Sequence, residues 1–158
     1  MITLINLIAQ VESGGFDGAI RFEEEKYQTM MDTPVKTFPQ SVGNCLVTIR
    51  DIHRCDFLTA LQIYCTSYGK FQFMGETLYS DPINLPFPIP VFWSSEIVQA
   101  SIFQKFVRER SIDIEIDPPR MDDYEQFATV WNGPDDVTGY ANRMLTVYKQ
   151  LKMKAGVA

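Results

Sequence analysis

Near its N-terminus the chain carries an apolar helical stripe that ends in a glutamate, a serine and two glycines, Glu12-Ser13-Gly14-Gly15. Apolar residues recur at the three-to-four spacing of one helical face, at Ile2, Ile5, Ile8 and Val11. Glu12 extends this inward face, where a charge is normally avoided because desolvating a carboxylate is costly. The glycines allow a sharp turn and leave room beside the carboxyl group. We expect Glu12 to keep its proton near neutral pH beside a glycine-lined opening; the alternative is a surface glutamate in a frayed last turn.

The composition is that of a globular protein with one core. At 158 residues the chain fits a single domain, residues 1–158, and no internal repeat or low-complexity segment divides it. Hydrophobic residues make up 46% of the chain, and its formal net charge is −6. Apart from the short tail Lys149–Lys154 there is no basic stripe. Nucleic acid and anionic membranes are therefore excluded as principal partners.

Neither a membrane span nor an export signal is predicted. No apolar run approaches the roughly 20 residues that a spanning helix needs. The first residues lack the positive region of a signal peptide, and their apolar face belongs to the first helix. We expect a protein made in the cytoplasm without an export signal of its own.

The histidine and cysteine content argues against metal and triad chemistry. Cys45, Cys55 and Cys65 are odd in number and have no metal-ligand spacing, so free thiols are expected. The single histidine, His53, has no acidic or cysteine cluster around it in the sequence. A metal site, a Ser-His-Asp triad and a cofactor are therefore not predicted.

The first half of the chain alternates short elements with loops. The alternation of Ile20–Glu23 predicts a brief strand with Arg21 and Glu23 on one face and Phe22 inward, and the run Glu23–Glu25 is read as solvated. Residues 32–43 are read as a loop, and 45–53 fits a helix or a strand, with helix favoured. Asp56 is expected to cap a helix whose buried stripe is Phe57, Leu61, Tyr64 and Tyr68.

The second half is predicted to be mostly helical. Residues 81–90 hold four prolines and are read as a rigid connector over the surface. A central buried helix is expected from about Ser94 to Arg110, capped by Ser94 or Ser95, with the apolar band Ile97, Val98, Ile102, Phe103, Phe106 and Val107. Residues 112–116 predict one short strand or turn. Two further helices are expected, from Asp122 or Asp123 to Trp131 and from Thr138 to about Lys152.

Three motifs, in order along the chain, form a pattern: Glu12-Ser13-Gly14-Gly15, Gly69-Lys70-Phe71-Gln72-Phe73-Met74-Gly75, and Trp131-Asn132-Gly133-Pro134 with Tyr140 beyond. With these residues the sequence resembles the lysozyme superfamily, and within it the goose-lysozyme-like lytic transglycosylases and the phage-type N-acetylmuramidase domains. The resemblance implies a mainly α (α+β), lysozyme-like helical domain with a small β element near the cleft. Trp131 stands where the family usually has a tyrosine.

The resemblance also implies roles for these residues. Glu12 would be the catalytic acid, with Tyr140 hydrogen-bonded to its carboxyl group. Substrate contacts would come from the other motif residues: Ser13, Gly69, Phe71, Gln72, Phe73, Met74, Trp131 and Asn132. Amides bind sugar hydroxyl and N-acetyl groups without adding charge. Core packing is the alternative for Phe71, Phe73, Met74 and Tyr140, and turn or cap hydrogen bonding is the alternative for Gln72 and Asn132.

Cleavage of the β-1,4 bond between N-acetylmuramic acid and N-acetylglucosamine in peptidoglycan is the implied activity. As a lytic transglycosylase, the enzyme would use Glu12 as acid and then as base, leaving a 1,6-anhydro end. As a hydrolase it would use a second carboxylate, for which Glu23 is the candidate. The charge run around Glu23 favours the first outcome. A non-catalytic wall-binding virion module is the third alternative, and holin-dependent release or a virion are the expected settings.

Overall fold

The computed structural model describes residues 2–113 and 119–156 of the chain. The α-helices of the described residues are α1 (Leu4–Ser13), α2 (Glu24–Asp32), α3 (Gln40–His53), α4 (Phe57–Tyr64), α5 (Gly75–Leu78), α6 (Ile89–Trp93), α7 (Glu96–Glu109), α8 (Met121–Trp131) and α9 (Val137–Lys154). Short 3-10 helices are η1 (Val35–Thr37) and η2 (Pro134–Asp136). The strands are β1 (Ile20–Phe22), β2 (Thr66–Tyr68) and β3 (Phe73–Met74).

Side-chain caps begin several helices where the sequence predicts them. The Asp56 carboxylate accepts a hydrogen bond from the Thr59 N–H at 2.8 Å, at the start of α4. The Ser95 hydroxyl accepts one from the Val98 N–H at 3.3 Å, at the start of α7. At the end of α1, Gly14 adopts the left-handed conformation with φ 65°, which glycine tolerates without strain. The chain therefore turns directly after Glu12 and Ser13.

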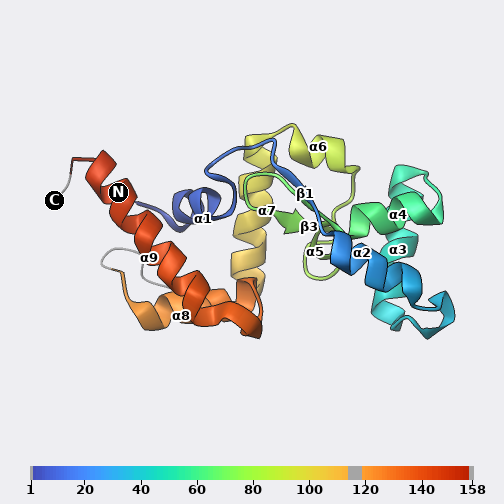
Figure 1. Ribbon diagram of the computed structural model, residues 1–158. Helices are drawn as coiled ribbons and strands as arrows, with labels where there is room; N and C mark the ends of the chain where they lie inside the picture. The colour runs from blue at the N-terminus through green and yellow to red at the C-terminus, as the bar shows by residue number, and fades with distance from the viewer. Residues whose placement is uncertain (1, 114–118, 157–158) are drawn as a thin grey trace.

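The helices form two lobes joined by α7 and the sheet (Figure 1). On one side lie α1, α8 and α9; on the other lie α2, α3 and α4. The antiparallel sheet has the order β1-β2-β3 and lies beside α7, with Ile20 opposite Tyr68 and Ser67 opposite Met74. A buried aromatic cluster in which Phe71 and Phe73 pack on Phe103 connects the sheet to α7. The observed architecture confirms the mainly α prediction with a small β element.

Several expectations for the first half are wrong. Phe22 is 45% exposed and packs on Tyr27 rather than inward, because β1 lies at the edge of the sheet. The acidic run Glu23–Glu25 is solvated as expected, with Glu24 and Glu25 exposed in the first turn of helix α2. Carboxylates are favoured there because the N-terminal end of a helix carries partial positive charge. The segment read as a loop over 32–43 already contains the start of α3 at Gln40. Helix α4 ends at Tyr64, so Tyr68 belongs to β2 and not to a helical stripe.

Two expectations for the second half are also wrong. The proline-rich connector is not confined to the surface, since Ile83 and Leu85 are buried in the core. Helix α7 does not bury its whole apolar band: Ile97 is 78% exposed, whereas Gln99 is fully buried. The alternation at 112–116 falls largely on residues outside the described ranges.

The three cysteines are free, as expected. None of the helices described is both long enough and apolar enough to cross a membrane.

Candidate active site

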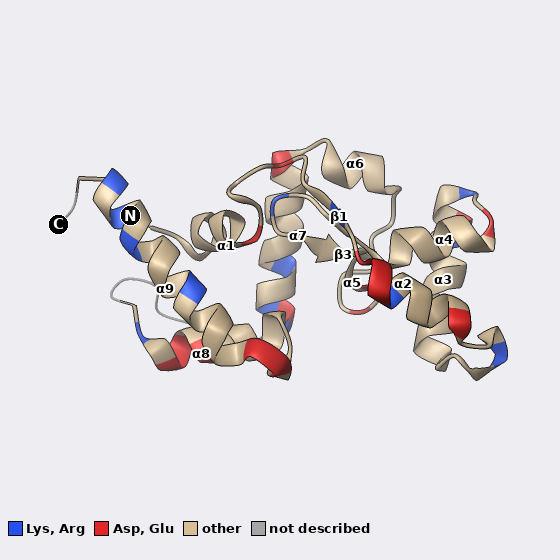
Figure 2. Ribbon diagram, in the orientation of Figure 1, with Lys and Arg blue, Asp and Glu red and all other residues tan. Residues whose placement is uncertain are grey.

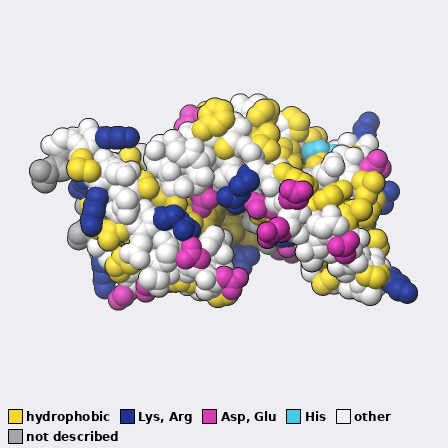
Figure 3. Space-filling view, in the orientation of Figure 1, with side chains coloured by type: hydrophobic (Ala, Val, Ile, Leu, Met, Phe, Trp, Pro, Cys, Tyr) yellow, Lys and Arg dark blue, Asp and Glu magenta, His cyan; other side chains and the backbone are white. Residues whose placement is uncertain are grey.

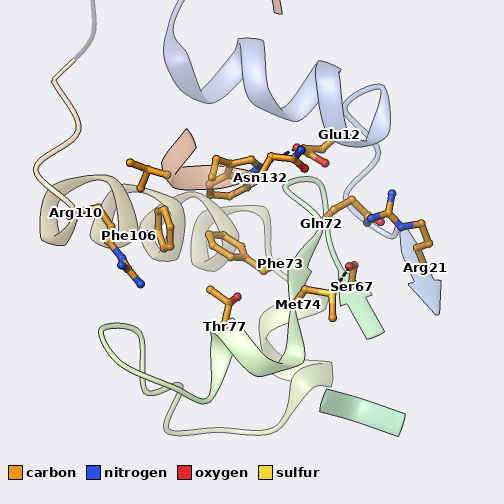
Figure 4. Close-up of a pocket in the computed structure, with 12 residues that line it drawn as sticks. Glu12, Arg21, Ser67, Gln72, Phe73, Met74, Thr77, Phe106, Arg110 and Asn132 are labelled. Atoms are coloured by element: carbon orange, nitrogen blue, oxygen red, sulfur yellow. Dashed lines mark hydrogen bonds between the residues drawn. The ribbon is translucent and has the colours of Figure 1, made fainter. Parts of the chain in front are cut away.

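A cavity of about 300 Å³ lies between the two lobes and is the setting of Glu12. Its walls come from the end of α1, the sheet, the start of α5, the end of α7 and the end of α8. The surface is visibly hollowed between the lobes (Figure 3). No other acidic side chain of the described residues lines this cavity. The close-up shows Glu12 and Asn132 on one side of it and Met74 and Thr77 on the other (Figure 4).

The Glu12 carboxyl group is held by two donors from the C-terminal helices. Its Oε1 accepts a hydrogen bond from the Trp131 indole N–H at 2.8 Å and another from the Tyr140 hydroxyl. Burial, together with the neighbouring Glu12, raises the pKa of Tyr140 well above its ordinary value. The phenol therefore remains a proton donor throughout the physiological range. Since both bonds end on Oε1, Oε2 is the oxygen of this carboxyl group left for a substrate.

Trp131 is positioned by an aromatic cluster. Its ring stacks on Phe127 with centroids 5.6 Å apart, and it meets the edges of Phe73 at 5.1 Å and Phe106 at 5.2 Å. Such contacts fix the ring orientation and hence the direction of the indole N–H. The tryptophan thus provides a hydrogen bond to the acid at the position where the related motif carries a tyrosine.

The turn between β2 and β3 forms the wall facing Glu12. Gln72 lies in the left-handed region, with φ 50°, and its side-chain N–H donates to the Gly69 carbonyl at 2.9 Å. Gln72, Phe73 and Met74 all line the cavity. The Ser67 hydroxyl oxygen lies 3.0 Å from the Met74 sulfur. A half-buried amide and a thioether thus stand beside aromatic surface, a lining suited to the mixed polar and apolar faces of a sugar.

Glu23 lies outside this cavity, in an adjoining one of about 800 Å³. The two cavities share Arg21, Met74 and Asn132, so they form one continuous groove. The Glu23 Oε1 accepts hydrogen bonds from the Arg21 guanidinium at 2.6 Å and from the Ser67 hydroxyl at 3.3 Å. Arg21 and Glu23 therefore share a face, as predicted, and the carboxylate is held at the edge of the groove.

Comparison with known proteins identifies the family. Residues 53–152 match the N-acetylmuramidase family, and the chain is 34% identical over 149 residues to the endolysin of Enterobacteria phage PRD1, a match that covers 90% of this chain and 92% of that relative. The chain belongs to the N-acetylmuramidase family. Membership confirms the resemblance to phage-type muramidase domains and places the chain among the enzymes that degrade peptidoglycan. No solved structure is matched significantly.

Three residues of this muramidase that the motifs assign to substrate binding lie away from the cavity. The Ser13 hydroxyl donates to the Lys70 carbonyl at 2.9 Å, which fastens the end of α1 to the turn below it. Phe71 is fully buried against Phe103. Gly69 is also buried, and its φ of 76° makes the turn possible. Ser13, Gly69 and Phe71 therefore stabilise the segments that form the cavity wall. Of the other assigned residues, Gln72, Met74, Trp131 and Asn132 line the cavity itself.

Sequence reasoning missed the polar residue that holds these segments together. The fully buried Gln99 accepts the Lys70 N–H at 2.7 Å and donates to the carbonyls of Asp17 and Trp93, each at 3.1 Å. Lys70 also bridges the carboxylates of Asp17 and Glu96, each at 2.6 Å. One sequence feature could have indicated that Gln99 is buried: it lies four positions before the apolar Phe103, and residues at this spacing share one face of a helix. The lining residues Thr77, Phe106, Arg110 and Val130 were not assigned to the site either.

Proposed function

We propose that this muramidase hydrolyses the β-1,4 bond between N-acetylmuramic acid and N-acetylglucosamine, with Glu12 as the general acid. The observation that carries the proposal is the setting of the Glu12 carboxyl group. It is held by Trp131 and Tyr140 at the wall of a cavity that lies between two lobes and is rich in aromatic surface. A groove of this kind accommodates a linear glycan, and its aromatic walls match the apolar faces of sugar rings.

The hydrogen bonds explain how Glu12 transfers its proton. Cleavage requires a proton on the leaving oxygen while positive charge builds on the sugar ring. Oε2 gives that proton, and the resulting charge spreads to Oε1, where the two donors already stand. Hydrogen bonds to an ionised acceptor are stronger than those to a neutral one. Trp131 and Tyr140 therefore stabilise the product of the transfer more than its starting state, which lowers the barrier.

Glu23 is proposed as the second carboxylate. It faces the adjoining part of the groove and is oriented by Arg21 and Ser67. A carboxylate so held stabilises the oxocarbenium-like sugar or directs water to it. Together with the family's description as N-acetylmuramidases, this arrangement favours hydrolysis over the anhydro outcome that the charge run alone favours.

A specific observation favours the alternative, a lytic transglycosylase. Among the described residues, Glu12 is the one acid lining its cavity. It would then also serve as base, removing the proton from the muramoyl 6-hydroxyl, which the substrate itself holds close to the reacting carbon.

Mass spectrometry of digested peptidoglycan tests the choice. We expect wild type to release fragments with reducing muramic ends, and Glu23→Gln to lose at least ~10-fold in rate while remaining folded. Glu24→Gln is the matched control, since it removes the same charge from the same edge of the groove, and it should retain wild-type activity. Anhydro ends, together with an active Glu23→Gln, would make the enzyme a transglycosylase. A folded wild-type protein that binds peptidoglycan without releasing fragments would establish the third alternative, a wall-binding module.

The Gln72 amide gives a further prediction. Gln72→Ala removes the amide and keeps a Cβ at this left-handed position, as in wild type, whereas Gln72→Gly removes both the amide and the strain of that Cβ. If the amide contacts sugar, both variants should lose activity by about tenfold with KM raised, the magnitude of one lost hydrogen bond to substrate. Steady-state kinetics on soluble glycan fragments measure this. Full activity of Gln72→Gly would show that Gln72 serves only the turn.

The biological setting proposed is lysis of a bacterial host. The relative from phage PRD1 is named an endolysin, and by extension this chain acts on the bacterial cell wall after synthesis in the host. Release through a holin and incorporation into a virion are the two proposed routes. Detection of the protein in purified particles by immunoblot distinguishes them.

A further inference from the structure

The charges along the groove are unevenly distributed. In the part that contains Glu12, cationic side chains come from Arg21 and Arg110. The charged lining of the adjoining part has an excess of acids: Glu23, Glu24, Glu25 and Asp135 against Lys26 and the shared Arg21. The ribbon shows the same division, with acidic residues at the start of α2 and basic ones toward the end of α7 (Figure 2). An anionic group on a bound glycan is thus favoured at the α7 end of the groove and disfavoured at the α2 end.

The two arginines differ in their pairing with the acidic side chains that the structure describes. Arg21 bonds to the Glu23 carboxylate at 2.6 Å, which offsets its charge. Arg110 makes no ion pair with any described residue, and its guanidinium lies 5.5 Å from the centre of the Phe106 ring. In an otherwise acidic protein, such a cation at a substrate cavity is suited to an external anion.

The backbone and the ring beneath Arg110 position this charge. Arg110 caps the C-terminus of α7, and its N–H donates to the Phe106 carbonyl at 3.0 Å. Phe106 is itself buried, so the surface supporting the guanidinium is fixed. In the close-up, Arg110 lies at the end of the lining residues opposite Arg21, beside Phe106 (Figure 4).

We propose that Arg110 forms a subsite for a carboxylate carried on the lactyl group of the muramoyl unit, which makes this muramidase selective for anionic glycan strands. The inference rests on the proposed function, because muramic acid is the sugar of peptidoglycan that carries such a substituent. Two sources present the same chemistry: the carboxylates of a stem peptide, and the free lactyl carboxylate of a strand from which the peptide has been removed. The planar guanidinium fits either one through paired N–H donors.

The test compares three substrates and three proteins. The substrates are intact peptidoglycan, the same material with its carboxylates converted to neutral methylamides, and strands stripped of peptides by an amidase. The proteins are wild type, Arg110→Gln and Arg108→Gln. Arg108 is an exposed neighbour on α7 that lies outside this cavity and 3.6 Å from Glu109. Both variants lose one positive charge, so general attraction to the wall changes equally in both.

We expect Arg110→Gln to lose about tenfold in kcat/KM on intact peptidoglycan and to lose nothing on the neutralised substrate. Arg108→Gln should follow wild type on all three. A loss on intact strands alone assigns the subsite to the carboxylates of the stem peptide. An equal loss on stripped strands shows that the subsite also accepts the lactyl carboxylate, which is amide-linked in intact strands and free only in stripped ones. High salt should reduce the Arg110 effect, because exposed ion pairs are screened.

Equal losses by Arg110→Gln on charged and neutral substrates, or equal losses by the two variants, would overturn the subsite while leaving the proposed cleavage intact. A folded wild-type protein that cleaves none of the three substrates would overturn the proposed function itself, and this inference with it.

Discussion

Glu12→Gln is expected to lower the rate of peptidoglycan cleavage at least ~100-fold and to leave the protein folded. The amide oxygen of glutamine can accept the hydrogen bonds that Trp131 and Tyr140 donate to Oε1. The amide nitrogen replaces Oε2 and has no proton to transfer at neutral pH. The substitution therefore removes the acid while keeping its shape and its partners.

Clearing of a cell-wall suspension measures the rate, and a thermal melt verifies folding. Glu109→Gln is the matched control, because it removes a carboxylate from an exposed position on α7, paired with Arg108 and outside the cavity. It should clear the suspension like wild type. Near-normal clearing by folded Glu12→Gln would remove Glu12 from the mechanism.

Gly75→Ala is expected to destabilise the protein by at least ~2 kcal/mol, the upper part of the range for overpacking a buried position. Gly75 is the first residue of α5 and is buried against the end of α4. A Cβ there would overlap the backbone carbonyl oxygen of Ile63. Relief requires α4 and α5 to move apart, since no flexible side chain is available to give way. Activity should fall with stability, because Phe73 and Met74 precede this position in the cavity wall.

Gly43→Ala is a control that should change the free energy of unfolding in the opposite direction. Gly43 lies inside α3, where a Cβ meets nothing within 4 Å. Alanine there should stabilise the protein by about 0.5–1 kcal/mol, because glycine loses more backbone freedom on folding. Urea unfolding midpoints measure both variants. A Gly75→Ala midpoint at or above wild type would contradict the packing that the structure shows.

Local rules predicted much of the fold. The caps at Asp56 and Ser95 and the glycine turn after α1 follow from residues a few positions apart, which a sequence displays directly. The same rules failed at Tyr68, where helical spacing continued beyond the true end of α4. Pairing with β1 and β3 decides that segment, and such pairing joins residues that are distant in the chain.

The candidate site was only partly predictable for the same reason. The contact between Tyr140 and Glu12 was implied by resemblance to related motifs, and the structure contains it. That Trp131 also donates to Glu12 depends on ring orientation, which aromatic neighbours from α7 and α8 determine. Gln99 was missed because its partners come from three separate segments, and none of them marks it in the sequence.

The distance along the chain between Glu12 and its two donors has a consequence for synthesis. The acid is made before both donors, since Trp131 and Tyr140 follow 119 and 128 residues later. A nascent chain on the ribosome therefore carries the carboxyl group long before the helices that orient it. A product of premature termination that ends before α9 keeps the acid but lacks the Tyr140 hydroxyl. The Glu12 site can therefore form only after Tyr140 has been synthesised, which delays the onset of activity during translation.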